Sequence, residues 1–315
     1  MNTPAISVVM SVYKEPEEWF RQSIGSILGQ TFTDFEFIII NDYPERADNH
    51  RILAEYARQD SRIRVLENDQ NRGLIYSLNR GLDVAQGKYI ARMDADDMSL
   101  SERFEKQYAY MEAHPECVVC GTQIAEFGDA AIQHHKYNAS DYDIRAHMLY
   151  TTGVAHPSVF IKNQMLQESG LRYDERYPYA EDYQMWYALS HLGTFHNLNE
   201  IGLRYRISHQ QTSRAKKLLQ QKTAQSVRLL FIRDWLRSLD CGSFEYSAEL
   251  SAKQALTPIL DKVSFTDSFY QYYIKTVYLT HRSNQLKNFY YGLISGDFFR
   301  LGLCERLCLI KHLFA

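Results

Sequence analysis

The sequence predicts an α/β protein with a mostly parallel β-sheet flanked by helices and a helical C-terminal extension. Two features of the chain lead to this class. Through the first hundred residues, short apolar runs alternate with segments of helical spacing, which is the pattern of β-α-β units. Beyond about residue 214, the apolar residues have helical spacing only. We therefore expect a first domain over residues 1–213 and a helical region over residues 214–315.

The four N-terminal strands are predicted from uninterrupted apolar runs, because strands of a parallel sheet are buried on both faces. The first run, AISVVMSVY, ends at the sequence Lys14-Glu15-Pro16. The strands are expected over residues 5–13, 35–42, 63–68 and 88–94. The helices between them are expected over residues 17–29, 46–59 and 74–85.

Beyond residue 100 the pattern is mixed. A helix is expected over residues 101–115, with Ser99 or Ser101 as its N-cap. A second helix, over residues 179–193, has acidic residues in its first turn, where they favour the positive end of the helix dipole. Strands are expected over residues 117–127, 155–162 and 201–208, and a long helix from about residue 214.

Composition restricts the class of protein. The formal net charge of −3 gives no reason to expect nucleic acid as a partner. The five cysteines form no disulfide framework, which fits a reducing compartment, and Cys117 and Cys120 are expected to be buried free thiols. The N-terminus has no basic segment followed by an apolar one, and no run of about 18 apolar residues occurs. We therefore expect a cytoplasmic protein.

Three carboxylates follow the fourth predicted strand: Asp94, Asp96 and Asp97. Like charges this close repel one another, and burial adds to the cost. A divalent cation such as Mg²⁺ or Mn²⁺ takes oxygen ligands and would supply the missing positive charge. An alternative is a solvated turn in which Asp97 or Ser99 caps the next helix, but that leaves Asp94 and Asp96 unexplained. We therefore predict a metal–diphosphate site at this strand end.

The order ISVVMSVYKEP, FIIIND and NRGLIYSLNRGLDVAQGKYIARMDADD resembles the GT-A glycosyltransferases, in particular the inverting group called family 2. The resemblance is strong over residues 5–98. It continues more loosely through HPSVF, the Glu-Asp pair and RYRISH to about residue 213. It implies a nucleotide-diphospho-sugar transferase fold and a metal-dependent transfer of sugar.

The resemblance assigns most of the donor site to the ends of the predicted strands. Asp42 occupies the position that bonds a pyrimidine base, although this chain has Asn41-Asp42-Tyr43-Pro44 where the family often has two acids and a Gly-Ser turn. Asp96 would bind the metal. The residues expected to contact the nucleotide sugar are Ser11, Val12, Tyr13, Glu15, Asp42, Asn71, Arg72, Asp94, Ala95 and Asp96.

Glu181 and Asp182 form a second acidic pair, at the start of a predicted helix. Taken alone, such a pair is explained by the helix dipole. The resemblance instead implies that Asp182 is the general base, which takes a proton from the acceptor hydroxyl, and leaves Glu181 on the acceptor side. It also implies that His209 completes the metal shell and that His156 packs on the acceptor side.

We therefore expect an inverting glycosyltransferase that moves a sugar from a nucleoside diphosphate donor, UDP-linked, to a glycan or lipid-linked glycan of a bacterial surface polysaccharide. Two alternatives stay open: a nucleotidyltransferase that makes a nucleotide sugar, and a non-catalytic nucleotide- or glycan-binding module. For the C-terminal helices, packing against the catalytic domain, oligomerisation and peripheral contact with the inner membrane stay open as well.

Overall fold

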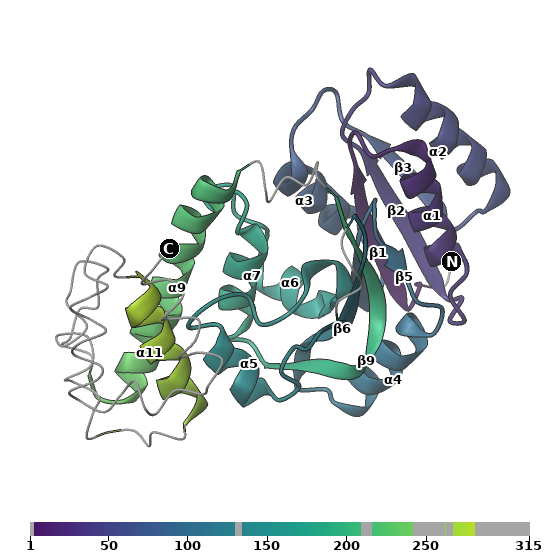
Figure 1. Ribbon diagram of the computed structural model, residues 1–315. Coiled ribbons are helices and arrows are strands. Elements are labelled where there is room, and N and C mark those ends of the chain that lie inside the picture. Colours follow the sequence, from purple (N-terminus) through teal and green to yellow (C-terminus); the bar gives the residue numbers. More distant parts are fainter. Residues whose placement is uncertain (1–2, 130–133, 209–215, 242–261, 263–266, 281–315) are drawn as a thin grey trace. The chain divides into compact units, whose positions relative to one another are not determined.

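The computed structural model describes residues 3–129, 134–208, 216–241, 262 and 267–280 (Figure 1). The described residues divide into two compact units. The first takes its residues from Met1–Asp141 and Val154–Thr223, and the second from Tyr142–Gly153 and Ala224–Ala315.

The first unit is built on one β-sheet with the strand order β3-β2-β1-β4-β8-β6-β9-β5, and β7 pairs with β6. The strands are β1 (Ile6–Val12), β2 (Phe35–Asn41), β3 (Ile63–Glu67), β4 (Tyr89–Asp94), β5 (Met98–Ser99), β6 (Cys117–Gly128), β7 (His134–His135), β8 (Phe160–Lys162) and β9 (Thr194–Ile207). The first four strands are parallel to one another, and β8 then joins β4 in antiparallel orientation. The predicted fold class and all four N-terminal strands are confirmed.

Helices cover both faces of the parallel strands, as the uninterrupted apolar runs require. In Figure 1, α1 and α2 lie on one face and α3 on the other. The helices of this unit are α1 (Glu17–Leu28), α2 (Ala47–Gln59), α3 (Leu74–Val84), α4 (Arg103–Ala113), α6 (Asn163–Ser169) and α7 (Glu181–Leu189), and a 3₁₀ helix spans His156–Ser158. The helices predicted over residues 17–29, 46–59 and 74–85 are therefore confirmed.

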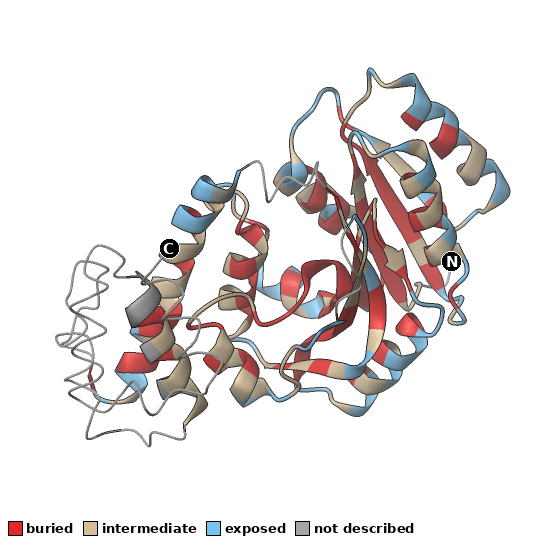
Figure 2. Cartoon of the chain, in the orientation of Figure 1, coloured by how far each residue is buried: buried red, intermediate tan, exposed pale blue. Residues whose placement is uncertain are grey.

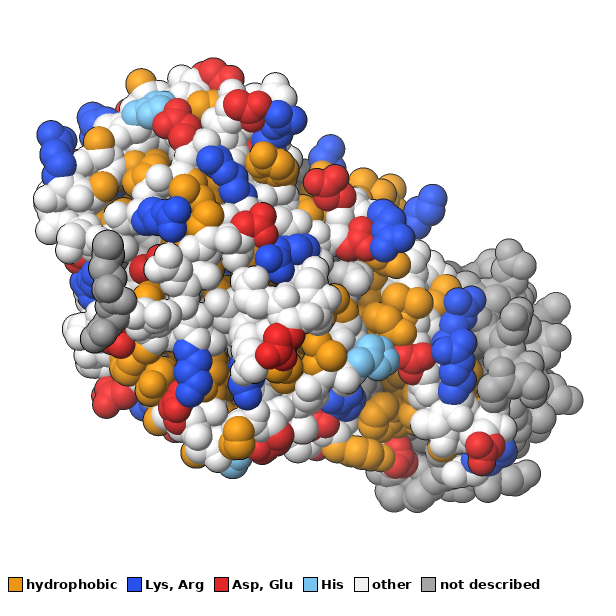
Figure 3. Space-filling model, turned by 180° about the vertical axis from the view of Figure 1, so that it is seen from behind, with side chains coloured by type: hydrophobic (Ala, Val, Ile, Leu, Met, Phe, Trp, Pro, Cys, Tyr) orange, Lys and Arg blue, Asp and Glu red, His pale blue; other side chains and the backbone are white. Residues whose placement is uncertain are grey.

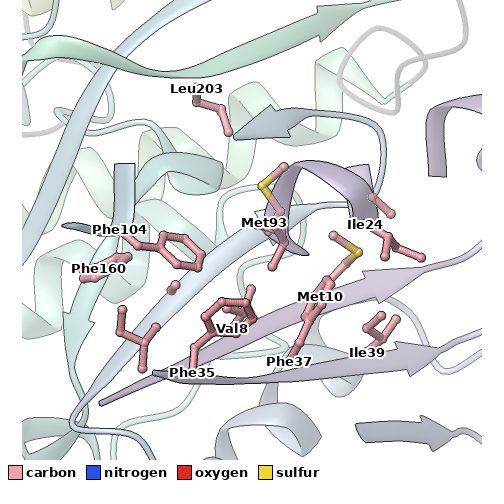
Figure 4. Close-up of a cluster of buried hydrophobic side chains, with 14 of the residues drawn as sticks. Val8, Met10, Ile24, Phe35, Phe37, Ile39, Met93, Phe104, Phe160 and Leu203 are labelled. Atoms are coloured by element: carbon pink, nitrogen blue, oxygen red, sulfur yellow. The ribbon is translucent and has the colours of Figure 1, made fainter. Parts of the chain in front are cut away.

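The strands are buried along most of their length (Figure 2), and apolar side chains of the strands together with Ile24 of α1 and Phe104 of α4 form a hydrophobic core cluster (Figure 4). The ring of Phe104 in α4 packs edge-on against Phe35, with centroids 5.7 Å apart, and lies 5.5 Å from Phe160. Cys117 and Cys120 are buried free thiols, as predicted. On the face of the molecule in Figure 3, acidic and basic side chains are interspersed among the described residues, in keeping with the small net charge.

Two predicted strands differ from the observed ones. The segment expected as a strand over residues 155–162 begins with the 3₁₀ helix, because Pro157 lies within it, and only Phe160–Lys162 pairs as β8. Strand β9 begins at Thr194, well before the predicted residue 201, because residues 194–197 already pair with β6, and the pairing resumes at Ile201 after a shift in register. The short elements α6, β5 and β7 were not predicted, since hydrophobic periodicity needs a longer window.

The second unit is helical within its described residues. It contains most of α5 (Asp141–His147) and of α9 (Lys217–Ser238), together with α11 (Ser268–Thr280). Trp235 of α9 packs against Tyr273 and Phe269 of α11, with ring centroids 5.0 and 6.0 Å apart. The predicted long helix is thus confirmed. Helix α5 was not predicted from the sequence. None of the helices described could cross a membrane, since each is too short or too polar. The apolar segment after residue 300 lies outside the described residues.

Replacing Gly87 with Ala should destabilise the first unit by about 1–3 kcal/mol, because overpacking forces the backbone apart. A Cβ at Gly87 would lie 2.4 Å from the Ser7 nitrogen and 2.6 Å from the Ile6 carbonyl carbon, at the joint between β1 and β4. The free energy of unfolding in urea measures the effect. Gly25→Ala in α1 is the control: nothing lies within 4 Å of its Cβ position, so it should be neutral or stabilising. Equal stability of the two variants would contradict this packing.

Candidate active site

The three carboxylates after β4 lie together at the carboxyl edge of the sheet. We call Asp94–Asp97 the acidic loop. One oxygen from each of Asp94, Asp96 and Asp97 lies within 4.8 Å of the others. Asp94 pairs in register with Ser11 at the end of β1, and its carbonyl accepts a 2.7 Å hydrogen bond from the Ser23 hydroxyl in α1. The sheet therefore brings the predicted donor-site residues of β1 and β4 side by side.

A buried cation, Arg92, faces these acids from β4, two residues before Asp94. Its side chain is only 4% exposed and forms an ion pair with Asp94. Burial is the largest single influence on the pKa of Arg92 and lowers it, but the charge of Asp94, the hydrogen bond to Asp94 and the charge of Asp97 together raise it further, so the net shift is upward. Its Nε has no hydrogen-bond partner within the described part of the chain. Arg92 thus supplies one buried positive charge to a site with several negative ones.

The charge of Arg92 does not by itself neutralise the acidic loop. Burial, with the charges of Asp94 and Glu15, raises the pKa of Asp96 to about 7. Burial and the charge of Asp96 raise the pKa of Asp97 well above its usual value. The Oδ2 atom of Asp97 is buried and has no hydrogen-bond partner among the described residues. An unpaired carboxylate oxygen in a set of hard oxygen donors fits a divalent cation of the Mg²⁺ or Mn²⁺ type.

The second acidic pair, at the start of α7, lies in the same electrostatic field. Burial and the neighbouring Asp182 raise the pKa of Glu181 to about 7. Burial raises the pKa of Asp182, which a 2.7 Å hydrogen bond from the Tyr183 nitrogen and the charge of Arg92 partly offset. The charges of Arg92 and Asp94 act on both acids of α7. The two acidic groups, far apart in sequence, are therefore coupled by their charges.

Asp42 joins the end of β2 to the loop before α3. Its buried carboxylate accepts hydrogen bonds from the Asn68 amide (2.7 Å) and from the backbone nitrogens of Arg72 (2.8 Å) and Gly73 (2.9 Å). Three donors leave a carboxylate room for one further hydrogen bond. Asp42 thus holds the predicted nucleoside-closing segment, and its contact with a base stays a prediction.

Asn49, at the start of α2, joins the ends of β1 and β2. Its buried side-chain amide donates to the Tyr13 carbonyl and to Asn41 Oδ1, each at 3.0 Å. Asn41 Oδ1 also accepts a 3.2 Å hydrogen bond from the Tyr43 nitrogen. The asparagine at position 41, where the family often has an acid, is therefore part of an uncharged network.

The residues after β1 form an aromatic and basic cluster. The rings of Tyr13 and Tyr43 have centroids 5.1 Å apart, and the Lys14 amine lies 4.8 Å from the first and 5.2 Å from the second. Glu15 turns back to accept a 2.7 Å hydrogen bond from the Tyr13 nitrogen, and burial raises the pKa of Glu15. Val12 lies beside Asn41 in the sheet. This cluster borders the acidic loop, because the charge of Asp94 acts on Glu15.

The structure places the remaining predicted residues as follows. Arg72 pairs with Asp69 at 2.6 Å on the exposed loop. Asn71 accepts a 3.0 Å hydrogen bond from the Gly73 nitrogen. Ala95 is buried within the acidic loop. The ligand roles of these three residues stay predictions, and His209 lies outside the described residues.

His156 is part of a buried cluster next to Arg92. Its Nε2 is 2.8 Å from the Tyr173 hydroxyl, and its ring lies edge-on to Trp186 of α7 at 5.8 Å. Burial and the charge of Arg92 hold the pKa of His156 well below its usual value, so the ring is neutral. The asparagine side chain of Asn79 in α3 bonds both the nitrogen and the carbonyl of Tyr173, at 2.8 Å each. This packing holds α7 and its acids in place.

Sequence reasoning missed Arg92 and Asn49. A signal for Arg92 existed: it is the one charged residue in the interior of the run KYIARMD, and a spacing of two residues in a strand puts it on the same face as Asp94. Asn49 had no such signal, because a polar residue in the first turn of a helix is common.

Comparison with known proteins gives one family. The family model described as glycosyl transferase family 2 matches residues 7–170. An uncharacterized glycosyltransferase of Methanocaldococcus jannaschii is 34% identical over 69% of this chain and 76% of its own length. The O-antigen biosynthesis glycosyltransferase WbnJ of Escherichia coli is 32% identical over 71% of this chain and 87% of its own length.

Solved structures agree with the fold. S. aureus TarS 1–349 in complex with UDP-GlcNAc superposes with a TM-score of 0.59 at 12% identity, covering 90% of this chain and 92% of that TarS chain. The mannosyltransferase PcManGT of Pyrobaculum calidifontis, in complex with GDP-Man and Mn²⁺, has a TM-score of 0.61 at 11% identity, covering 99% of this chain and 85% of PcManGT.

Without divalent metal, the acids of this site should make the protein less stable as the pH rises from about 4 to about 7. Asp96 and Glu181 have folded pKa values of about 7, above their ordinary values of 3.8 and 4.5. The native state therefore binds more protons than the unfolded chain in this window, and stability falls with pH. The free energy of unfolding, measured with urea in EDTA, should increase for the Asp96→Asn/Glu181→Gln variant relative to the wild type as the pH rises. A pH-independent difference would refute these raised values.

Proposed function

Because the chain belongs to glycosyltransferase family 2, and is therefore a glycosyltransferase, we propose that it transfers a sugar from a UDP-linked donor to a glycan hydroxyl with inversion at the anomeric carbon. The observation that carries this proposal is the buried field around Arg92, which contains both the acidic loop and the acids of α7. A donor site and a base in one field are what a single displacement requires.

The donor is proposed to bind over the carboxyl ends of β1, β2 and β4, where a parallel sheet binds its ligands. The nucleotides bound by TarS and PcManGT support a nucleoside diphosphate. The nucleoside would lie against the aromatic cluster after β1 and the segment that Asp42 holds, with Asp94 near the ribose. The residues proposed to contact the donor are Ser11, Val12, Tyr13, Glu15, Asp42, Asn71, Arg72, Asp94, Ala95 and Asp96.

Asp96 is proposed as the main protein ligand of a Mn²⁺ or Mg²⁺ ion, with His209 as a second. The unpaired Asp97 oxygen and the raised pKa of Asp96 support a site that lacks positive charge. Such an ion neutralises the charge that develops on a departing diphosphate. The Mn²⁺ of PcManGT adds support for a metal in this fold.

Asp182 is proposed as the general base. The acceptor hydroxyl oxygen would form a bond to the anomeric carbon while the bond from that carbon to the diphosphate breaks, and the hydroxyl proton would pass to Asp182. Burial raises the pKa of Asp182, which makes it a stronger base than an exposed aspartate. Glu181 and His156 would then line the acceptor side of the same site.

The acceptor class is proposed from the relatives. WbnJ is named for O-antigen biosynthesis, and a bacterial surface glycan of this kind, free or lipid-linked, is the proposed acceptor. Residues 1–213 would form the catalytic domain. Residues 214–315 would pack against it, mediate oligomerisation or contact the cytoplasmic face of the inner membrane, as the basic and apolar residues of LCERLCLIKHLF suggest.

Asp96→Ala should abolish metal-dependent turnover. With a panel of nucleotide sugars and Mn²⁺, we expect the wild type to release UDP and the variant to release none above background, because the metal ligand is lost. Mn²⁺ should raise the melting temperature of the wild type but not that of the Asp96→Ala variant. Asp83→Ala, which removes an exposed acid paired with Arg172, is the control and should behave as wild type. Full activity of the Asp96 variant in EDTA would disprove the metal role.

Asp182→Asn separates catalysis from helix capping. The change is nearly isosteric, so a structural role predicts a loss of stability of about 1 kcal/mol or less, with activity retained. A general base predicts an unchanged melting temperature and donor affinity with kcat down roughly a hundredfold or more. Asp174→Asn, at an acid bonded to Arg176 in the turn before α7, is the control. If the Asp182 variant keeps more than about a tenth of wild-type kcat, Asp182 is not the base.

A further inference from the structure

The end of strand β9 runs alongside the acidic loop. Strand β5, directly after the loop, pairs with β9 in antiparallel register, with Met98 opposite Arg204 and Ser99 opposite Leu203. The Leu100 nitrogen continues this pairing with a 2.9 Å hydrogen bond to the Gly202 carbonyl. Two residues beyond Arg204, strand β9 reaches the level of Asp96 and Asp97.

Arg206 donates two hydrogen bonds to the acidic loop. The backbone nitrogen of Arg206 donates to Asp97 Oδ1 at 2.8 Å, and its side-chain Nε donates to the Asp96 carbonyl at 2.7 Å. Both Arg206 and Asp97 are buried. The two bonds use the backbone and side chain of one residue to hold two consecutive residues of the loop.

The far end of the Arg206 side chain is held as well. Its Nη2 donates to the Gln22 side chain of α1 at 2.6 Å. The guanidinium plane lies over the rings of Trp19 and Phe127, at 4.7 and 4.3 Å from their centroids. With donors used on two sides and aromatic rings beside it, this guanidinium is fixed against α1 and β6.

We propose that Arg206 and Asp97 are positioning residues. They fix the backbone of the acidic loop so that the Asp96 carboxylate stays in place to bind the metal of the donor site, and Arg206 does not bind the donor diphosphate. We call the two hydrogen bonds from Arg206, one to Asp97 Oδ1 and one to the Asp96 carbonyl, the β9 clamp. Its link to catalysis rests on the proposed function, since Asp96 is the proposed metal ligand. The clamp itself is a structural feature of the loop, so its presence can be tested without metal or substrate.

Conservative variants distinguish a positioning role of Arg206 and Asp97 from a role that depends only on the positive charge of Arg206. Arg206→Lys keeps the positive charge, but an ammonium group cannot reproduce the planar fork that bonds Asp96 and Gln22 while stacking on Trp19. A diphosphate-binding cation would tolerate this change better than a clamp would. Asp97→Asn keeps an oxygen that accepts from the Arg206 nitrogen, whereas Asp97→Ala removes it.

Arg204 is the matched control. It lies on the same strand, is exposed, and also lies over Phe127, at 4.7 Å. No bond to the acidic loop comes from its side chain in the described structure. Arg204→Lys therefore removes an arginine of the same strand without changing the clamp.

The test combines amide hydrogen exchange of the segment 94–100 with Mn²⁺ affinity measured by electron paramagnetic resonance. We expect Arg206→Lys and Asp97→Ala to speed exchange in this segment roughly tenfold, and to weaken Mn²⁺ binding about 10- to 100-fold, as for other residues that orient metal ligands. Asp97→Asn and Arg204→Lys should exchange as wild type. Binding of UDP without metal should be unchanged in Arg206→Lys.

Each outcome decides the proposal. Unchanged exchange in Arg206→Lys, or a loss of metal-free UDP binding with normal exchange, overturns it and makes Arg206 a phosphate contact. Faster exchange in Arg204→Lys to the same extent also overturns it. If the wild type itself binds no Mn²⁺, the proposed metal site fails, and the exchange data alone decide whether the clamp exists.

Discussion

The buried charge of Arg92 is the interaction on which the rest of the site depends. A guanidinium that is 4% exposed is costly to desolvate unless opposite charges surround it. Asp94 provides the direct partner, and the acids of the acidic loop and of α7 lie within the same field. Burial, together with the charges of neighbouring acids, raises the pKa of Asp96 and Glu181 to about 7, so these groups gain or lose a proton near neutral pH.

The parallel sheet makes this concentration of charge possible. Strands β1, β2, β3 and β4 all end at one edge, so loops that are far apart in sequence meet there. Uncharged amides then fix the loops: Asn49 joins the ends of β1 and β2, and Asn68 joins Asp42 to α3 through Ser77. Neutral donors hold these positions without adding charge to a site that already has an excess of it.

The antiparallel part of the first unit supplies the second acidic pair, which the parallel strands do not carry. It brings α7 with Glu181 and Asp182 to the sheet, and the contact of His156 with Tyr173 and Trp186 holds that helix in place. It also brings the end of β9 to the acidic loop. The acidic loop and the acids of α7 thus come from different segments of one compact unit.

The sequence alone determined the parallel half of the sheet and the identity of its acidic loop, because uninterrupted apolar runs and strand-end acids are local patterns. It did not determine β9 before residue 201, whose polar residues form a strand only through pairing with β6. Nor did it determine that Arg92 neutralises Asp94 within reach of Asp182, or that Arg206 bonds Asp96. The relations of Arg92 to Asp182 and of Arg206 to Asp96 join residues far apart in the chain, and tertiary packing decides them, because burial and proximity set the strength of every charge interaction in the site.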